Sequence, residues 1–397
     1  MVERPKIERV RGRPIYLDNH ATTAVDPRAV QAMLPYFTER YGNPHSASHF
    51  YGWEAAEAVE VAREQVARLI GAESDEIIFT SGATEANNLA LKGVARFYRG
   101  RKNHIVSVTT EHMCVLDSLF HLEREGTRVT YLTVGSDGLI DLKELAAAIT
   151  EDTVLVSIMT VQNEIGVIQP IAEIGTLCRA RGVFLHTDAA QAAAKIMVDV
   201  KAMDVDLLSL TGHKLYGPMG VGALYIGKKP RVRLEPLFSG GGQERNIRPG
   251  TLPAPLCVGF GAACEIGRAE MGEESGRLGR LRDRLLDRLN TVGGIHVNGS
   301  LAARVPGNLN VSVEGARAED LIAALPDLAF STGSACSSVS EESSYVLRAI
   351  GLRNEMAESS LRFGLGRFNT EAEIDYAADR LVEEIVAVRA RKRHAAE

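Results

Sequence analysis

Short apolar segments alternate with longer segments of helical periodicity from about residue 50 to residue 226. The short segments predict strands, and the longer ones predict helices between them. The predicted strands are 76–81, 104–108, 128–134, 153–160, 183–187 and 206–210. The predicted helices are 53–70, 83–98, 115–124, 142–149 and 171–181. Strands joined by crossover helices form a mostly parallel sheet covered by helices on both faces, and ligands bind at the carboxyl ends of its strands.

The pattern changes after about residue 252 and predicts a smaller α+β unit. Its predicted helices are 256–289, 318–325, 345–350 and 371–391, and its predicted strands are 308–313 and 360–364. A chain of 397 residues is long enough for two domains. We therefore expect a large α/β domain over 21–262, and a small domain formed by 1–20 and 263–397.

Composition excludes several classes of protein. The net charge of −6 gives no electrostatic reason to expect a nucleic-acid partner. No apolar run approaches the ~20 residues of a membrane-spanning helix, and the N-terminus lacks the apolar core of a secretory signal. The five cysteines are scattered without a CxxC pair, so we expect no disulfide framework and no metal site. These features favour a reducing compartment, the cytoplasm.

Lys214 follows the predicted strand 206–210 and opens a glycine-rich segment within 209–224. A sheltered lysine loses its proton more easily than a surface lysine, so Lys214 is a candidate nucleophile for carbonyl chemistry. The alternative is a surface lysine beside an ordinary glycine turn.

Asp188 ends another apolar strand and precedes Lys214 by one strand and one crossover. A buried carboxylate needs a cationic or hydrogen-bonding partner, either an arginine or a protonated pyridine nitrogen. The order of the strands places Asp188 and Lys214 at neighbouring strand ends that face one cavity. A carboxylate for a pyridinium nitrogen and a lysine for a Schiff base are what pyridoxal phosphate requires.

An anion site is predicted where Gly82, Ala83 and Thr84 open a helix, because the first backbone N–H groups of a helix are free. The alternative is an ordinary N-cap formed by Ser81 or Thr84. The polar, glycine-rich segment 240–251 is either a phosphate-contacting loop that reaches across a dimer interface or a flexible surface loop.

Four further residues stand out, each with a plainer alternative. His112 and Asn163 follow predicted strands, where a structural histidine and a turn asparagine are also common. Cys336 lies among small polar residues, which suits an exposed thiol that can act as a nucleophile. An incidental loop cysteine is an equal alternative. Arg362 suits the carboxylate of a substrate, or pairs with a structural acid.

Taken together and in order, these motifs resemble the cysteine desulfurases, pyridoxal-phosphate enzymes of fold type I in the class-V aminotransferase group. The resemblance runs from Tyr16 to about Ile374. The matching segments are 16–23, 80–88, 110–112, 163–166, 186–191, 212–224, 240–251, 331–337 and 360–368. It implies a seven-stranded, mostly parallel sheet in the large domain, and a homodimer.

The resemblance also implies a role for each residue of the cofactor site. Lys214 forms the Schiff base, Asp188 pairs with the pyridinium nitrogen, and Gln191 bonds the phenolic oxygen. His112 stacks on the ring and is a candidate for proton transfer. The phosphate is assigned to Ala83, Thr84, Thr211 and His213, with Thr251 contributed by the partner subunit.

For the substrate, the resemblance assigns the carboxylate of L-cysteine to Arg362 and Asn163. Lys214 removes the α-proton, Cys336 takes the sulfur as a persulfide, and L-alanine leaves. The sulfur then passes to an acceptor protein, such as an iron–sulfur scaffold. Relatives that dock such a scaffold carry a C-terminal extension, whereas this sequence stops soon after its last predicted helix, so docking in that manner stays open.

Three rival functions differ from this expectation. A selenocysteine lyase has the same fold and acts on a different amino acid. An aminotransferase has no need of Cys336, and a non-catalytic scaffold has no need of both Lys214 and Asp188.

Overall fold

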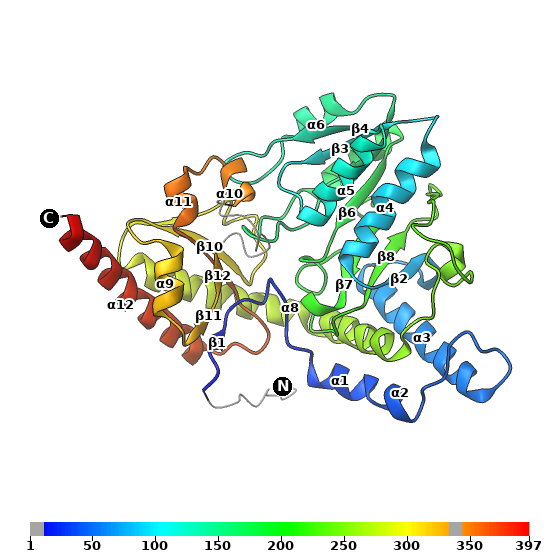
Figure 1. Cartoon of the computed structure of the whole chain (residues 1–397), viewed down its shortest axis with the longest axis horizontal. Helices are drawn as coiled ribbons and strands as arrows, with labels where there is room; N and C mark the ends of the chain where they lie inside the picture. The colour runs from blue at the N-terminus through cyan, green and yellow to red at the C-terminus, as the bar shows by residue number, and fades with distance from the viewer. Residues whose placement is uncertain (1–11, 333–343, 397) are drawn as a thin grey trace.

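The computed structural model describes residues 12–332 and 344–396. Its largest element is a seven-stranded sheet with helices on both faces (Figure 1). The strand order is β2 (Ile77–Thr80), β8 (Gly222–Ile226), β7 (Leu207–Thr211), β6 (Phe184–Asp188), β5 (Thr153–Ser157), β3 (His104–Val108) and β4 (Arg128–Leu132). Strand β8 runs antiparallel to the other six strands of this sheet, which are parallel to one another. The predicted mostly parallel α/β sheet is therefore confirmed.

Alternate residues of each strand enter two apolar clusters, one on each face of the sheet. Phe79 belongs to the cluster beneath α3 and α7, whereas its neighbour Ile78 belongs to the cluster beneath α4 and α5. The helices of this unit are α1 (Pro27–Met33), α2 (Pro35–Thr38), α3 (Phe50–Leu69), α4 (Ala83–Tyr98), α5 (Met113–Arg124), α6 (Leu142–Ala148) and α7 (Ile171–Arg181). Short 3-10 turns lie at η1 (Ser74–Glu76), η2 (Gly212–Lys214) and η3 (Glu244–Asn246).

Strand β8 is the main element that the sequence prediction missed. Its first residue has no side chain, and a Cβ added at Gly222 would lie 2.7 Å from the Cα of Gly82. The glycine therefore lets β8 pass close to the turn that opens α4. A glycine-rich start hides the strand periodicity that follows it.

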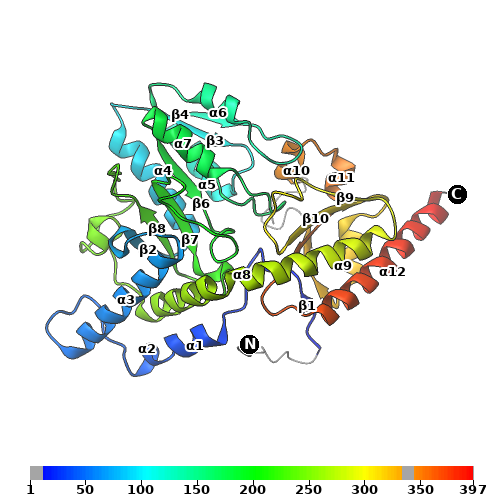
Figure 2. The same ribbon diagram turned by 180° about the vertical axis from the view of Figure 1, so that it is seen from behind.

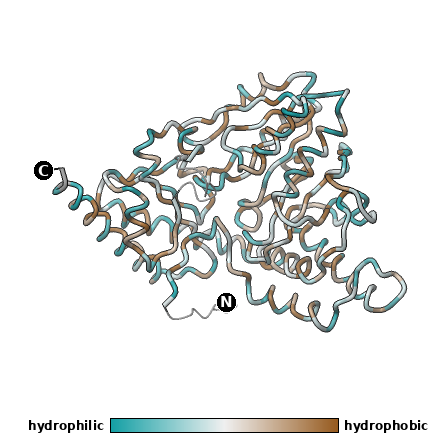
Figure 3. The backbone as a smooth tube through the Cα atoms, in the orientation of Figure 1, coloured by the Kyte–Doolittle hydropathy of each residue, from teal (hydrophilic) through white to brown (hydrophobic). Residues whose placement is uncertain are grey.

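The second unit is built on a four-stranded antiparallel sheet (Figure 2). The strand order is β12 (Ser331–Thr332), β13 (Ser360–Gly364), β10 (Asn308–Val313) and β9 (Ile295–Val297), and a separate parallel pair joins β1 (Ile15–Tyr16) to β11 (Leu328–Ala329). Its helices are α9 (Ala318–Ala324), α10 (Tyr345–Ala349), α11 (Asn354–Glu358) and α12 (Glu371–Ala396). Figure 3 shows hydrophobic and hydrophilic residues alternating along α12, as expected for a helix that covers a core on one side.

Helix α8 (Ala254–Asn290) joins the two units. Its first half contributes Cys257 and Phe260 to the core of the large sheet, and its second half contributes Leu281 and Leu285 to the core of the small one. The predicted boundary at residue 262 falls inside this helix, and the division into two domains stays a prediction. Within the described residues, no helix has both the length and the apolarity to cross a membrane.

Candidate active site

Asp188 and Lys214 lie at the carboxyl ends of neighbouring parallel strands. Asp188 is the last residue of β6 and stands opposite Ser209 of β7. Lys214 ends the single 3-10 turn that follows β7. Because parallel strands end at the same edge of a sheet, the turn brings the amine and the carboxylate to one edge.

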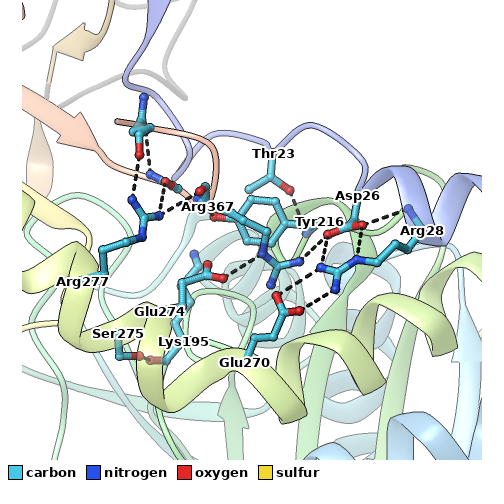
Figure 4. A network of polar contacts seen from close by, with 12 residues as sticks. Thr23, Asp26, Arg28, Lys195, Tyr216, Glu270, Glu274, Ser275, Arg277 and Arg367 are labelled. Atoms are coloured by element: carbon cyan, nitrogen blue, oxygen red, sulfur yellow. Dashed lines mark hydrogen bonds and ion pairs between the residues drawn. The ribbon is translucent and has the colours of Figure 1, made fainter. Parts of the chain in front are cut away.

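The backbone around Lys214 is held by Thr23. The carbonyl of His213 accepts hydrogen bonds from the backbone N–H (2.8 Å) and from the hydroxyl (3.0 Å) of Thr23. The Thr23 hydroxyl in turn accepts from the backbone N–H of Tyr216 at 2.9 Å (Figure 4). Tyr216 has a φ of 65°, a left-handed conformation that costs an aromatic residue about 1–2 kcal/mol. Sequence reasoning gave Thr23 no role, although it lies in the matching segment 16–23.

Asp188 is buried and accepts hydrogen bonds from two neutral donors. These are the side-chain amide of Asn87 at 2.7 Å and the backbone N–H of Ala190 at 2.8 Å. Neither donor supplies positive charge, so the carboxylate suits a cationic ligand such as a protonated ring nitrogen. The role of Asn87 was missed, although it lies within the matching segment 80–88.

His112 caps the N-terminus of α5. Its Nδ1 accepts the backbone N–H of Cys114 at 3.2 Å and lies 3.1 Å from the Cys114 sulfur. Because Nδ1 accepts a backbone N–H, the proton of the neutral ring is on Nε2. Burial, followed by the charge of Lys214, lowers the pKa of His112, and the charge of Asp188 opposes this shift. The lowered pKa favours the neutral ring, which lies within electrostatic reach of both residues.

The N-terminus of α4 is free of a side-chain cap. Its N-cap is Gly82, with a φ of 150°, and neither Ser81 nor Thr84 caps the helix. A Cβ added at Gly82 would lie 3.6 Å from the Thr211 hydroxyl oxygen, so this hydroxyl lies beside the free N–H groups. The arrangement suits a phosphate.

His213 lies next to Lys214 and is half-buried. Burial, then the charges of Lys214 and Lys195, lower the pKa of His213 to about 4. The imidazole is therefore neutral at physiological pH, and it can bind a phosphate as an N–H donor but not as a cation.

Arg362 lies on β13 with only 2 % of its side chain exposed. Its Nη2 forms an ion pair with Asp18 at 2.9 Å, and its Nη1 donates to the backbone carbonyl of Asn163 at 3.2 Å. The structural acid that the sequence left as an alternative is thus present. Among the described residues, the Arg362 Nε–H has no acceptor, which leaves this donor available to a ligand. The role of Asp18 was missed.

The segment 240–251 is anchored at two points. Glu244 is buried and forms a bidentate ion pair with Arg63, with both distances at 2.8 Å. Arg248 pairs with Glu85 of α4 at 2.7 Å. Thr251 follows this anchored part and is exposed. Cys336 lies outside the described residues.

Comparisons with known proteins agree on the family. The description "Aminotransferase class-V" matches residues 15–377. The chain is 55 % identical to "Cysteine desulfurase IscS" of Rickettsia rickettsii (strain Iowa) over 95 % of this chain and 92 % of the relative. It is 58 % identical to "Cysteine desulfurase, mitochondrial" of Drosophila melanogaster, over 97 % of this chain and 83 % of the relative.

Solved structures show the same fold. A "NIFS-LIKE PROTEIN" superposes with a TM-score of 0.88 at 37 % identity, covering 94 % of this chain and 99 % of that chain. "SspA in complex with cysteine" has a TM-score of 0.80 at 37 % identity and covers 89 % of this chain and 99 % of that chain.

The chain therefore belongs to the class-V aminotransferase family, whose fold-type-I architecture it shares. Within that family it belongs with the cysteine desulfurases. The resemblance that the motifs suggested is confirmed.

Proposed function

We propose that this protein binds pyridoxal 5′-phosphate, converts L-cysteine to L-alanine, and transfers the sulfur to Cys336 as a persulfide. The placement of Asp188 and Lys214 at neighbouring strand ends carries the proposal. Membership of the cysteine desulfurases supports the substrate, and one structural neighbour, SspA, is described as a complex with cysteine.

The described residues fit two polar groups of the cofactor, the ring nitrogen and the phosphate. Asp188, which accepts from the neutral donors Asn87 and Ala190, suits the ring nitrogen. The uncapped start of α4 at Ala83 and Thr84, with Thr211 beside it, suits the phosphate. When bound, pyridoxal phosphate supplies a carbonyl group and an electron sink.

The protein's own residues divide the remaining work. Lys214 anchors the cofactor through its amine and moves the α-proton of the substrate. Arg362 binds the substrate carboxylate with the donor that Asp18 leaves free, and Asn163 lies beside it. His112 would help to hold the ring and would offer its Nε2–H there. The Cys336 thiolate attacks the substrate sulfur, so that an S–S bond forms as the C–S bond breaks.

We propose a homodimer in which Thr251 reaches the phosphate of the partner subunit. Large apolar side chains are exposed on one segment of the large unit, which is unusual for an uncovered surface. They are Leu34, Phe37, Tyr41, Phe50, Tyr51 and Trp53. Light scattering coupled to size exclusion is expected to give twice the chain mass; a monomer at micromolar concentration would contradict the proposal.

The sulfur acceptor is proposed to be a protein of iron–sulfur cluster assembly or of thio-compound synthesis, in the cytoplasm. The IscS name of the relatives supports the first of these. Four described cysteines are free thiols, which supports a reducing compartment.

A test of the reaction supplies L-cysteine to the reconstituted enzyme and assays alanine and sulfide together. Cys336→Ser is expected to keep the visible absorption of the bound cofactor and to lower sulfide release at least about 100-fold, because the sulfur loses its nucleophile. Cys178→Ala, which changes a buried thiol of α7, is expected to retain turnover. A wild-type protein that binds no pyridoxal phosphate, or unchanged turnover in Cys336→Ser, would refute the proposal.

A further inference from the structure

The Gln191 side chain is held by three hydrogen bonds. Its amide nitrogen donates to the backbone carbonyl of His20 at 2.8 Å. Its carbonyl oxygen accepts from the Lys195 ammonium at 2.8 Å and lies 3.0 Å from Nδ1 of His20. The Gln191 and His20 side chains are buried and Lys195 is partly buried, so water competes little for the Gln191 amide.

These contacts allow only one orientation of the amide. A backbone carbonyl accepts and an ammonium donates, so the Gln191 nitrogen must face His20 and its oxygen must face Lys195. A flipped amide would set oxygen against oxygen on one side and nitrogen against ammonium on the other. The same logic places a proton on Nδ1 of His20, because it meets the amide oxygen. One Nε2–H of Gln191 then remains without an acceptor in the described part of the chain.

Lys195 is suited to act on Gln191 by charge as well as by geometry. Its backbone carbonyl accepts from Ser275 of α8 at 2.6 Å, which fixes its position (Figure 4). It lines an enclosed cavity of about 20 Å³, together with His20 and Glu274. Burial, then the charge of Lys214, lowers the pKa of Lys195 to about 7, and Glu274 opposes the shift, so the ammonium form that bonds Gln191 is lost as the pH rises through about 7. An ammonium on the amide oxygen withdraws electrons from the amide and strengthens its N–H groups as donors.

We propose that Lys195 is a positioning residue that fixes and polarises Gln191, so that the free Nε2–H of Gln191 donates to the phenolic oxygen of bound pyridoxal phosphate. The inference rests on the proposed function, because it concerns the same cofactor. Lys195 itself does not touch the cofactor; it acts through the Gln191 amide.

The test is a double-mutant cycle on Lys195→Met and Gln191→Ala, with pyridoxal phosphate binding and the visible spectrum as readouts, both at one fixed pH below the pKa of Lys195. Lys195→Met is expected to raise the dissociation constant of the cofactor about tenfold and to change the ratio of the visible bands, because a charge-assisted hydrogen bond is lost. In the Gln191→Ala background, the same change is expected to alter binding less than twofold, since its target is already gone.

A second variant guards against misfolding. Lys195→Gln keeps an N–H donor without the charge, and an effect of about threefold is expected. Lys201→Met, which changes an exposed lysine paired with Glu73, is the matched control and should match wild type. An unchanged Lys195→Met protein, or an equal loss in both backgrounds, overturns the inference. Failure of the wild type to bind the cofactor would instead overturn the proposed function.

Discussion

Lys214→Ala is expected to lower the turnover of L-cysteine by at least about 10³-fold while the protein still binds pyridoxal phosphate. In the proposed function one amine both anchors the cofactor and moves the substrate's α-proton, and removal of a general base alone costs about 10²–10⁴-fold. The uncapped start of α4, Thr211 and Asp188 remain in place and retain the cofactor without a covalent bond.

Borohydride reduction followed by intact-mass measurement separates the two roles of Lys214. The wild type is expected to gain the mass of the reduced cofactor, and Lys214→Ala is expected to gain none. Lys228→Ala, which removes an exposed lysine paired with Asp75, serves as the control and should behave as wild type. Normal turnover by Lys214→Ala, or labelling of that variant, would contradict the assignment.

The joining of Asp188 and Lys214 was predictable because it depends on chain order alone. Two parallel strands in succession end at the same edge of a sheet, whatever their side chains are. Helix α4 and strands β10 and β13 were predicted with their observed bounds, because their apolar residues follow one period throughout. Strand β8 was missed because it begins with Gly222, which has no side chain and so lies close to Gly82. A glycine at the start of a strand hides the alternating pattern that identifies it.

The partners of the site residues were not predictable in the same way. Arg362 pairs with Asp18 across a separation of 344 residues, and His20 meets Gln191 across 171 residues. No local period encodes such pairs, since they depend on how segments far apart in the sequence are brought together by the fold. The residues that act on the site are thus found only once the fold is known.

Arg367→Met is expected to lower the free energy of unfolding by about 3–5 kcal/mol, the cost of breaking a buried ion pair on one side. Arg367 has 1 % of its side chain exposed and bonds Asp26 and Glu274, each at 2.8 Å (Figure 4). Its guanidinium lies 4.2 Å from the centre of the Tyr216 ring, and its backbone N–H donates to the Tyr216 hydroxyl at 2.6 Å. The variant therefore leaves two carboxylates short of a cation and removes the guanidinium that packs on Tyr216, two residues after Lys214.

The pH dependence of this deficit tests its electrostatic origin. Burial raises the pKa of Asp26, but hydrogen bonds from Arg28 and Arg367 outweigh it and hold the pKa below its ordinary value of 3.8. A carboxylate with a lowered folded-state pKa contributes stability above its unfolded pKa and loses it as the pH falls through the folded pKa. Loss of Arg367 raises the folded-state pKa of Asp26, so the deficit is expected to be complete near pH 7 and to shrink as the pH falls below about 4.

Urea unfolding at one protein concentration measures the deficit, because dissociation of the proposed dimer would make the midpoint depend on concentration. Arg284→Met is the matched control: Arg284 is 48 % exposed and pairs with Asp375, and its loss is expected to cost less than about 1 kcal/mol. Equal losses in the two variants would mean that burial adds nothing to the Arg367 network. A deficit that does not shrink as the pH falls from 7 to below about 4 would assign the loss to packing against Tyr216 instead of to charge.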